Sequence, residues 1–312
     1  MRILLVGGMG YIGSSVASLL SLRGHEVVMV GRWSPIDESR WGQIVVWNAN
    51  QEWKNSIPTV DVVVHLASAN GDHTLSTLDT YLNNLAVTRN VLELCGRIKN
   101  AAVMYVSTLQ VFGKWYGELT VDSTATPVSE YGFSHWVAEE QVKMFARINS
   151  RKSLILRLSN VCGVGAAPQT VRWGTVPAEF CLQAVRKRSI TVHSNRSTQR
   201  DFITIERVAT QICDLIENKD SWDGKVALVG SGVSSTIGDI ADLVSEIAQQ
   251  LIGVPVPIHF ESASETREIE PRLQVICETP GSSDSTVAGE SVVGQLRMAI
   301  RNLILLAIER DE

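Results

Sequence analysis

The 312-residue sequence lacks the features that would direct it to a membrane or to a nucleic acid. It contains no run of about 18 apolar residues, which a helix needs to span a bilayer. The nearest candidate, Val292–Ile308, is interrupted by Arg297 and Arg301, which predicts an amphipathic helix instead. The formal net charge is −5 and no long basic run occurs, whereas a nucleic-acid surface needs clustered Lys and Arg. We therefore expect neither a membrane nor a nucleic acid as a partner.

The sequence also lacks a cysteine framework and the spacing of a metal site. None of its five cysteines stands in a C-x-x-C pair, so neither a zinc site nor a set of disulfides is predicted. No spacing of His, Asp or Glu suggests another metal. The apolar start Met1–Val6 runs directly into glycines without a cleavage site, which favours a buried strand over a signal peptide. We expect a reduced, cytoplasmic protein.

Short β-branched runs alternate with helical patterns through the first half of the chain. This alternation predicts an α/β fold, a Rossmann-type doubly wound parallel sheet with helices on both faces. The predicted strands are Arg2–Val6, Glu26–Val30, Ile44–Trp47, Val60–His65, Ala102–Ser107 and Ser153–Leu158. The predicted helices are Gly10–Arg23, Thr80–Lys99 and Ser134–Asn149.

The second half is punctuated by six prolines, which predict irregular insertions and short helices at the carboxyl edge of the sheet. The segment Cys277–Gly289 has the composition of a flexible loop. We therefore expect a nucleotide-binding domain over residues 1–165. Residues 166–312 are expected to form a smaller substrate-binding subdomain, with some segments returning to the sheet.

Three glycines follow the first predicted strand and open the first predicted helix. Gly7, Gly10 and Gly13 form G-x-x-G-x-x-G, which permits a tight turn and close approach of the backbone to a pyrophosphate. The free N–H groups and the dipole of the helix N-terminus favour an anion there. Because glycine turns also arise for conformational reasons, the flanking strand and helix are what favour a dinucleotide.

The end of the second predicted strand bears on which dinucleotide binds. A protein that binds NAD usually places an acidic residue there for the ribose 2′-hydroxyl. This chain has Gly31 at that position, followed by Arg32, whose guanidinium can pair with a 2′-phosphate. We therefore expect NADP(H) in preference to NAD(H), although Arg32 can also be read as a solvated loop cation.

Five further segments stand out along the chain. They are Val106–Gly113 (VSTLQVFG), Tyr131–His135 (YGFSH), Asp61–Ala67 (DVVVHLA), Leu156–Gly163 (LRLSNVCG) and Arg200–Phe202 (RDF). Together they resemble the extended short-chain dehydrogenase/reductase family, in its nucleotide-sugar epimerase, dehydratase and ketoreductase branch, and the resemblance covers nearly the whole chain.

The resemblance implies a role for individual residues. Tyr131 is the expected acid/base and Thr108 the expected hydroxyl beside the reacting oxygen, with Ser107 as the alternative if the alignment shifts by one. Asn160 and Arg200 are expected to hold the diphosphate of a nucleotide-sugar. The expected cofactor contacts are Gly7, Gly10, Tyr11, Ile12, Gly13, Arg32, Leu66, Ala67, Asn84 and His135.

One position departs from the family pattern Y-x-x-x-K, because His135 stands where the lysine is expected. The lysine binds the nicotinamide ribose and lowers the pKa of the tyrosine, whereas a histidine is shorter and mostly neutral at pH 7. Three readings remain open. His135 substitutes for the lysine in a working enzyme, or the enzyme is slow or tuned to acid pH, or the chain binds its ligand without turnover.

The sequence leaves the reaction open among three hypotheses. The first is a 4-ketoreductase that takes hydride from NADPH, and the second is an epimerase that retains its NAD(P). The third is a nucleotide-sugar or NADP(H) binding protein without turnover. A dehydratase is less favoured because Thr108 is followed by Leu109 and Gln110 rather than by an Asp-Glu pair. His73 is a candidate second acid/base, although a solvated loop histidine is the simpler reading. The family further implies a homodimer through residues 80–99 and 134–149.

Overall fold

The computed structural model describes residues 1–33, 42–56, 58–68, 77–114, 116–261, 272–277 and 291–311. His73 lies outside the described residues, as does the predicted flexible loop beyond Cys277. Within the described ranges, no helix is both long enough and apolar enough to cross a membrane.

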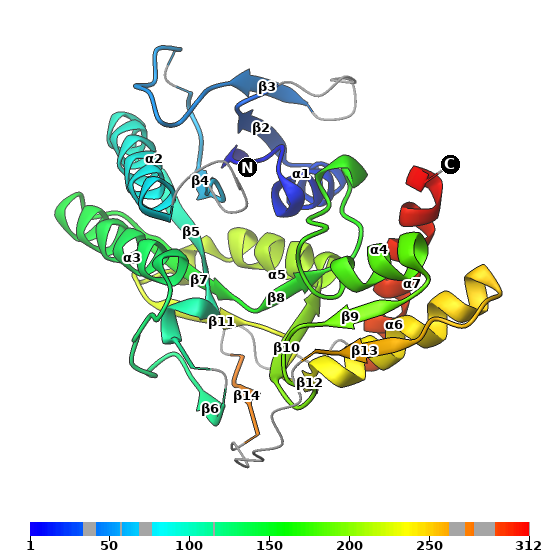
Figure 1. Ribbon diagram of the computed structural model, residues 1–312. Helices are drawn as coiled ribbons and strands as arrows, with labels where there is room; N and C mark the ends of the chain where they lie inside the picture. Colours follow the sequence, from blue (N-terminus) through cyan, green and yellow to red (C-terminus); the bar gives the residue numbers. More distant parts are fainter. Residues whose placement is uncertain are drawn as a thin grey trace.

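A seven-stranded sheet forms the centre of the molecule (Figure 1), with the order β11-β7-β5-β4-β1-β2-β3 and all neighbours parallel. The chain starts in the interior at β1, moves outward to β2 and β3, and returns to β1's other side at β4. This reversal leaves a crevice beyond the carboxyl ends of β1 and β4, where α/β sheets bind ligands. The strands are β1 (Arg2–Val6), β2 (Glu26–Gly31), β3 (Gln43–Val46), β4 (Val62–His65), β5 (Ala102–Thr108), β7 (Ser153–Leu158) and β11 (Val226–Val229).

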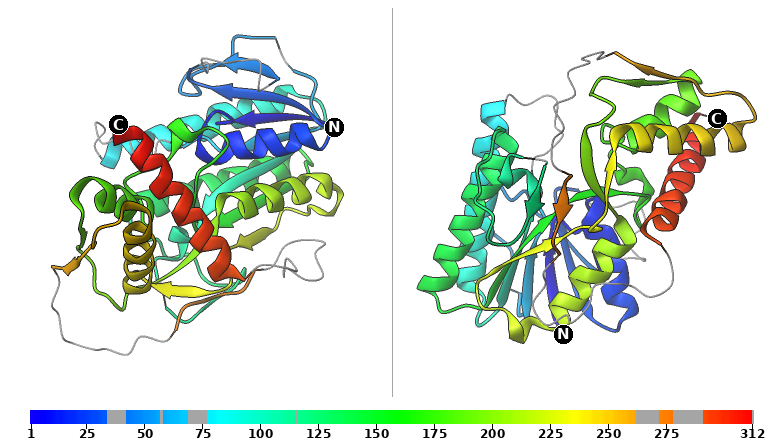
Figure 2. Two further views of the ribbon diagram at one scale, coloured as in Figure 1. Left: turned by 90° about the vertical axis from the view of Figure 1, so that its right-hand side faces the viewer. Right: turned by 90° about the horizontal axis from the view of Figure 1, so that it is seen from below.

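Two pairs of helices cover the two faces of this sheet (Figure 2, right). Helices α1 (Tyr11–Leu22) and α5 (Ile205–Glu217) pack on one face, and α2 (Thr77–Arg97) and α3 (Glu130–Ile148) pack on the other. Each face of the sheet has its own apolar core, and alternate residues of a strand pack into the two cores. In β1, Ile3 and Leu5 face α1 and α5, whereas Leu4 and Val6 face α2 and α3. Because both faces are covered, the interiors of the central strands are mainly apolar, as expected for a parallel sheet.

A second apolar core lies in the other half of the molecule, between α4 (Ala178–Lys187), α6 (Ile237–Ile252) and α7 (Val292–Asp311). Three small sheets complete this half and its surroundings, with the orders β12-β10-β8, β13-β9 and β14-β6. Their strands are β6 (Glu118–Leu119), β8 (Asn160–Cys162), β9 (Ile190–Val192), β10 (Gln199–Thr204), β12 (Ser234–Thr236), β13 (Ile258–Phe260) and β14 (Gln274–Val275). The short 3₁₀ helices are η2 (Leu109–Phe112), η3 (Pro168–Thr170) and η4 (Lys219–Ser221).

The prediction of short helices in the second half is only partly confirmed, because η3 and η4 are short whereas α5 and α6 are not. Helix α5 has 13 residues and α6 has 16, and both present an apolar stripe to a core. The prolines do not exclude α5 and α6, because the segment 178–254 that forms them contains no proline. Elsewhere, proline is tolerated where a helix begins. Pro168 opens η3 and Pro177 directly precedes α4. The predicted amphipathic helix from Val292 is confirmed and extends to Asp311.

Helix α3 begins earlier than the sequence pattern predicts. It starts at Glu130 rather than Ser134, because the Ser129 side chain accepts a hydrogen bond from the Gly132 amide at 3.1 Å and caps the helix. Tyr131 therefore belongs to the first turn of α3. This start places Tyr131 and His135 one turn apart on a continuous helix, on the same side of it.

Candidate active site

A cavity of about 620 Å³ lies at the crevice where the strand order reverses. Its walls come from the residues that end or follow β1, β2, β4 and β5, and from the loops and strands of the second half. Among the described residues that line it there is no Asp or Glu, whereas Arg32, Arg172 and Arg200 are all present. The cavity therefore presents positive charge to a ligand, which suits a molecule that carries several phosphates.

The glycine turn after β1 forms the floor of this cavity. Gly7 has φ +88°, and a Cβ on it would lie 2.8 Å from the Ala67 nitrogen. A Cβ on Gly13 would lie 2.3 Å from the Gly7 oxygen. Gly10 caps α1 in an extended conformation without a side-chain hydrogen bond, which leaves the N-terminal amides of α1 available. A backbone cradle at a helix N-terminus fits the pyrophosphate of a dinucleotide.

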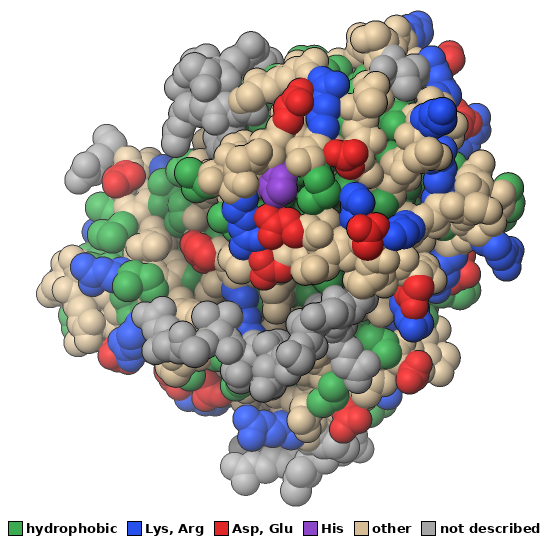
Figure 3. Space-filling view, turned by 180° about the vertical axis from the view of Figure 1, so that it is seen from behind, with side chains coloured by type: hydrophobic (Ala, Val, Ile, Leu, Met, Phe, Trp, Pro, Cys, Tyr) green, Lys and Arg blue, Asp and Glu red, His purple; other side chains and the backbone are tan. Residues whose placement is uncertain are grey.

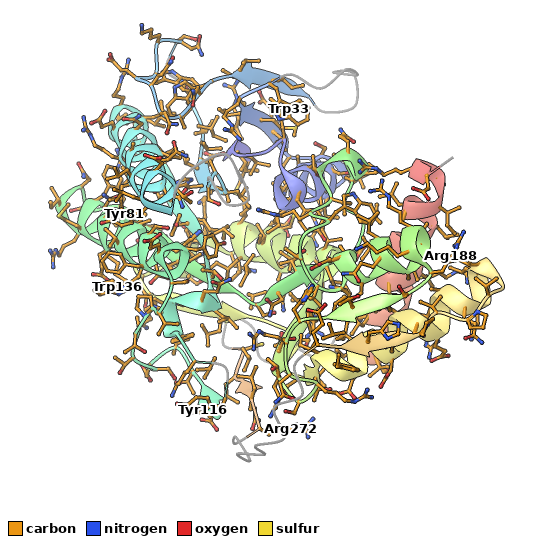
Figure 4. The ribbon with its side chains drawn as sticks, in the orientation of Figure 1. Trp33, Tyr81, Tyr116, Trp136, Arg188 and Arg272 are labelled. Carbon is orange, nitrogen blue, oxygen red and sulfur yellow. The ribbon has the colours of Figure 1, made fainter. Side chains whose placement is uncertain are left out.

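The end of β2 forms the neighbouring wall. A Cβ on Gly31 would lie 3.1 Å from the Sδ atom of Met9, so the buried Met9 side chain takes the space beside this position. The next residue, Arg32, is exposed at the cavity rim, and Trp33 follows it with 44% of its surface exposed (Figure 4). The structure thus provides a cation rather than a carboxylate where the ribose 2′ position is expected.

The predicted acid/base and its companion hydroxyl line the same cavity. Tyr131 projects from the first turn of α3, and Thr108 ends β5. The Thr108 Oγ1 atom accepts a hydrogen bond from the Gln110 amide at 3.2 Å and so caps η2. Its own hydroxyl hydrogen is available to a ligand, because accepting from an amide does not use it.

The alternative hydroxyl, Ser107, is engaged in a buried network. Its Oγ atom donates to Glu139 Oε1 at 2.6 Å, and Arg157 donates to both Glu139 oxygens at 3.0 and 2.7 Å. Glu139 is fully buried and Arg157 is 4% exposed. Because the Ser107 hydrogen is committed to a carboxylate, the geometry favours Thr108 as the hydroxyl that meets a substrate. This ion pair was missed from the sequence, where two charged residues 18 positions apart give no signal of burial.

His135 lies behind Tyr131, and the two rings meet edge to face with centroids 4.5 Å apart. Its Nδ1 atom is 2.7 Å from the Tyr105 hydroxyl, and its buried Nε2 atom has no hydrogen-bond partner among the described residues. Burial lowers the pKa of His135 to about 4, so the ring is neutral at pH 7. Tyr105 was missed because it lies inside an apolar strand whose pattern predicts only core packing.

A second buried histidine stands on the far side of Tyr105. The His65 ring lies 5.1 Å from the Tyr105 ring, and His65 Nε2 is 3.1 Å from Thr88 Oγ1. Burial lowers the pKa of His65 to about 3, and the nearby His135 lowers it further in the same direction. Two neutral imidazoles therefore flank one buried phenol behind the cavity.

The predicted diphosphate contacts line the opposite wall. Asn160 donates from Nδ2 to the Asp201 backbone oxygen at 2.8 Å, and Arg200 donates to the Gln199 backbone oxygen at 2.7 Å. The buried Asp201 carboxylate accepts from the Ser231 and Gly232 amides, each at 2.9 Å, which fixes β10 under Arg200. Arg172 also lines this wall, and no sequence motif predicts that it does.

The remaining predicted cofactor contacts divide into two groups. Tyr11, Ile12, Leu66 and Ala67 line the cavity, and the Tyr11 hydroxyl also donates to the Gly163 backbone oxygen at 2.8 Å. Asn84 does not line it. This side chain is buried and donates from Nδ2 to Ser134 Oγ at 3.1 Å, and the preceding Asn83 reaches the cavity wall instead. The prediction of direct cofactor contact by Asn84 is therefore not supported by its position.

The described residues form no metal site beside this cavity. No group of three His, Cys, Asp or Glu side chains among the residues described here could hold a metal ion. On the face shown in Figure 3, acidic and basic side chains are interspersed rather than separated into areas of one sign.

Comparison with known proteins defines the class. Residues 3–230 match the model of the NAD dependent epimerase/dehydratase family, and the chain belongs to this family. Its members include nucleotide-sugar epimerases, dehydrogenases and decarboxylases, so the protein is an NAD(P)-dependent nucleotide-sugar enzyme.

Two curated relatives and one solved structure cover nearly all of the chain. The dTDP-6-deoxy-L-talose 4-dehydrogenase (NAD(P)(+)) of Kitasatospora kifunensis is 25% identical, covering 97% of this chain and 93% of its own. The UDP-N-acetyl-alpha-D-glucosaminuronate decarboxylase of Bacillus cytotoxicus is 24% identical, with coverages of 89% and 92%. The UDP-glucuronic acid 4-epimerase from Bacillus cereus, solved with NAD, is 20% identical with a TM-score of 0.78 and coverages of 98% and 96%. This likeness confirms the predicted α/β fold.

Proposed function

We propose that the protein is a 4-ketoreductase that uses NADPH to reduce a keto-sugar nucleotide, with Tyr131 as the proton donor. The observation that carries this proposal is the composition of the cavity. It combines a glycine cradle and a tyrosine with three arginines, and its described walls hold no carboxylate. NADPH and a nucleotide-diphosphate sugar together bring a 2′-phosphate and two diphosphates. These anions favour a cavity lined by arginines and disfavour one lined by carboxylates.

The cofactor assignment depends on the end of β2. Arg32 stands at the rim beside the glycine cradle, where a guanidinium can pair with a 2′-phosphate through two parallel hydrogen bonds. Met9 packs against Gly31, so an acidic side chain at that position would require Met9 to move. These two features support NADP(H) as the preferred cofactor. The name of the Kitasatospora relative, which includes NAD(P)(+), is consistent with it.

In the proposed reduction, a bound NADPH supplies the hydride to the sugar carbonyl carbon. The Tyr131 phenol donates its proton to the carbonyl oxygen as negative charge develops there. Thr108 donates a hydrogen bond to the same oxygen, which holds the carbonyl in place and stabilises that charge. Asn160, Arg172 and Arg200 hold the substrate diphosphate on the opposite wall.

A second candidate is a nucleotide-sugar epimerase, favoured by the family whose model the chain matches. In this reaction Tyr131 first removes a proton from a sugar hydroxyl and later returns one to the ketone. The same residues serve both reactions, and the two differ in whether the cofactor leaves after each turnover. A protein that binds these ligands without turnover is the third candidate, and it is favoured by the absence of the lysine that His135 replaces.

One experiment separates the three. The purified protein is incubated with NADPH and a panel of 4-keto nucleotide-sugars, and in parallel with 4-hydroxy nucleotide-sugars. We expect stoichiometric NADPH oxidation with a keto substrate. Interconversion of hydroxy isomers without net oxidation of NADPH would contradict the ketoreductase and support the epimerase. Binding without either reaction would contradict both enzyme activities.

The cofactor preference has its own test. Fluorescence titration should show that Arg32→Ala weakens NADPH binding by about tenfold or more while NADH binding changes little, because a charge-assisted bidentate pair contributes roughly 1.5–3 kcal/mol. Arg188→Ala, at the end of α4, is the matched control for loss of a surface arginine (Figure 4). Equal losses for NADPH and NADH in Arg32→Ala would contradict the preference.

A further inference from the structure

We propose that Tyr105 is a positioning residue that selects the tautomer of His135 and holds its Nε2–H toward the cavity. The proposal rests on the proposed function for its effect on turnover, but the tautomer itself is a property of the protein alone. It assigns to this chain a neutral N–H donor at the place where the family pattern has a charged lysine.

The first step is the geometry of the pair. Tyr105 lies in β5, between the sheet and α3, and its ring and the His135 ring stack with centroids 5.8 Å apart. The Tyr105 hydroxyl is 2.7 Å from His135 Nδ1, a normal distance for a hydrogen bond. Both side chains are buried, at 4% exposure each. The Nδ1 edge of the imidazole therefore faces the core.

The second step is the direction of this hydrogen bond. Burial raises the pKa of the Tyr105 phenol well above its usual value, so the phenol keeps its proton. Among the described residues, His135 Nδ1 is the partner of that hydroxyl, and no second acceptor receives its hydrogen. Were Nδ1 protonated, the Tyr105 hydrogen would be buried without an acceptor, which is costly. Tyr105 therefore donates to a bare Nδ1, and the neutral ring carries its own proton on Nε2.

The third step concerns the neighbours that could compete for this bond. His65 is the other titratable ring beside Tyr105, but its Nε2 faces Thr88 and its Nδ1 has no hydrogen-bond partner among the described residues. Glu139, one turn beyond His135 on α3, is bonded to Ser107 and Arg157. Neither group takes the Tyr105 hydrogen, so the direction of donation toward His135 stands.

The fourth step is what the fixed proton offers. The buried His135 Nε2 has no hydrogen-bond partner among the described residues, although His135 lines the cavity and touches Tyr131. A buried N–H of this kind is satisfied when a hydroxyl acceptor arrives in the cavity. A hydroxyl of the bound cofactor or the Tyr131 oxygen can accept from it. By fixing the tautomer, Tyr105 keeps a neutral Nε2–H donor on His135, at the position where the family pattern has a charged lysine.

The test begins with the protein in the absence of ligands. The protein is labelled with ¹⁵N-histidine, and long-range ¹H–¹⁵N correlation spectra at pH 7 report which ring nitrogen of each neutral histidine carries the proton. His135→Ala identifies the His135 signals among those of the six histidines. We expect a single Nε2–H tautomer in the wild type and a mixture of tautomers in Tyr105→Phe. A single Nδ1–H tautomer in the wild type, or an unchanged spectrum in Tyr105→Phe, would overturn the proposal.

Turnover supplies the second readout, through a double-mutant cycle. We expect Tyr105→Phe to lower kcat by about tenfold with little change in KM for the sugar substrate, because it disturbs a proton-transfer site rather than substrate binding. In a His135→Lys background the same change should cost less than about twofold, since a lysine does not depend on a tautomer. Equal losses in both backgrounds would show that Tyr105 only supports the fold.

Tyr81→Phe is the matched control variant. Tyr81 lies on α2 and stacks on Phe133 with centroids 5.6 Å apart, outside the cavity wall (Figure 4). Removing its hydroxyl should leave both the His135 spectrum and kcat unchanged. If the wild type shows no turnover with any substrate, the proposed function fails, and the spectra of the wild type and Tyr105→Phe still decide the tautomer.

Discussion

The described walls of the cavity combine three kinds of side-chain chemistry, each held by a different part of the backbone. Tyr131 offers a phenol from a helix, Thr108 offers a hydroxyl from a strand end, and the arginines offer charge from loops and strands. The neutral His135 behind the phenol adds no charge of its own. Stabilisation of a developing oxyanion therefore has to come from hydrogen bonds, such as those that Tyr131 and Thr108 can donate.

The phenol gives the sharpest prediction for a single residue. Tyr131→Phe should lower kcat by roughly 10²–10⁴-fold, because it removes the proposed proton donor without removing the ring that contacts His135. The dissociation constant for NADPH should stay within about threefold, as the change deletes one hydroxyl. Steady-state kinetics and fluorescence titration measure the two quantities. Tyr116→Phe, on an exposed tyrosine far from the cavity (Figure 4), controls for loss of a phenol. Activity near that of the wild type would exclude Tyr131 as the acid.

Individual site residues could be predicted where they belong to a motif of neighbouring residues in the sequence. The glycine cradle, Thr108 and Tyr131 stand in local motifs, and the structure brings all of them to one cavity. Arg172 and Tyr105 carry no such motif. Arg172 reaches the cavity from a loop of the second half, and Tyr105 reads as a core residue of β5. Their roles depend on contacts between distant segments, which periodicity and spacing do not encode.

At the scale of elements, α3 connects the reacting groups to the sheet. One side of the helix carries Tyr131, His135 and Glu139 at intervals of four residues, and Glu139 pairs with Arg157 of β7 beneath it. The Arg157 guanidinium also lies over the Phe112 ring at 4.7 Å. The ion pair therefore ties together α3, β7 and, through Ser107, the end of β5.

This buried pair gives a prediction of stability. Arg157→Met should lower the free energy of unfolding by about 3–5 kcal/mol, because it leaves the Glu139 carboxylate buried without its partner. Arg297→Met is the matched control. Arg297 also forms two hydrogen bonds to a carboxylate, that of Glu246, but both side chains are about half exposed, so its loss should cost less than about 1 kcal/mol. Chemical denaturation measures both values, and similar losses would contradict this account.

The elements of the first half were predicted more accurately than those of the second. Strands β1 and β7 have the predicted bounds, because parallel strands covered on both faces have runs of apolar residues. Helices α5 and α6 are longer than predicted because they lie between Pro177 and Pro255, where the second half has no proline. The start of α3 was missed by four residues because the cap at Ser129 lies outside the apolar pattern.

At the scale of the whole molecule, the two buried histidines link stability to pH. Burial lowers the pKa values of His65 to about 3 and of His135 to about 4, below the unfolded value of about 6.5. Between these values the unfolded chain binds protons that the native protein does not. Stability therefore rises with pH through this window and is lost as pH falls from about 6.5 toward 4.

This linkage can be measured by comparison with variants. Between pH 6.5 and 4.5, the unfolding free energy of His65→Gln and of His135→Gln should depend less on pH than that of the wild type. The expected difference for each is up to roughly 1.4 kcal/mol per pH unit. His193→Gln, on an exposed side chain, controls for loss of a histidine at the surface. Parallel pH curves for the wild type and both core variants would exclude this linkage.

Assembly into a homodimer is the other prediction for the whole molecule. Helices α2 and α3 pack against each other, and they carry exposed apolar side chains at Leu78, Leu82, Met144 and Ile148. A homodimer through these two helices would bury such side chains. Sedimentation should show a dimer that Leu82→Glu shifts toward monomer, whereas Met298→Glu on α7 leaves it intact. A wild-type protein that stays monomeric at all concentrations would contradict the predicted homodimer.

The position of α7 has a consequence for how the chain is made. Helix α7 packs directly against α4, with Leu303 and Ile304 in the same buried core as Ala184. More than one hundred residues separate these partners, since α4 ends at Lys187 and α7 begins at Val292. A ribosome therefore releases α4 well before the helix that covers it, and the apolar surface of α4 is exposed to solvent in the meantime. The half of the molecule that carries Arg172 and Arg200 can complete its core only after nearly the whole chain has been made.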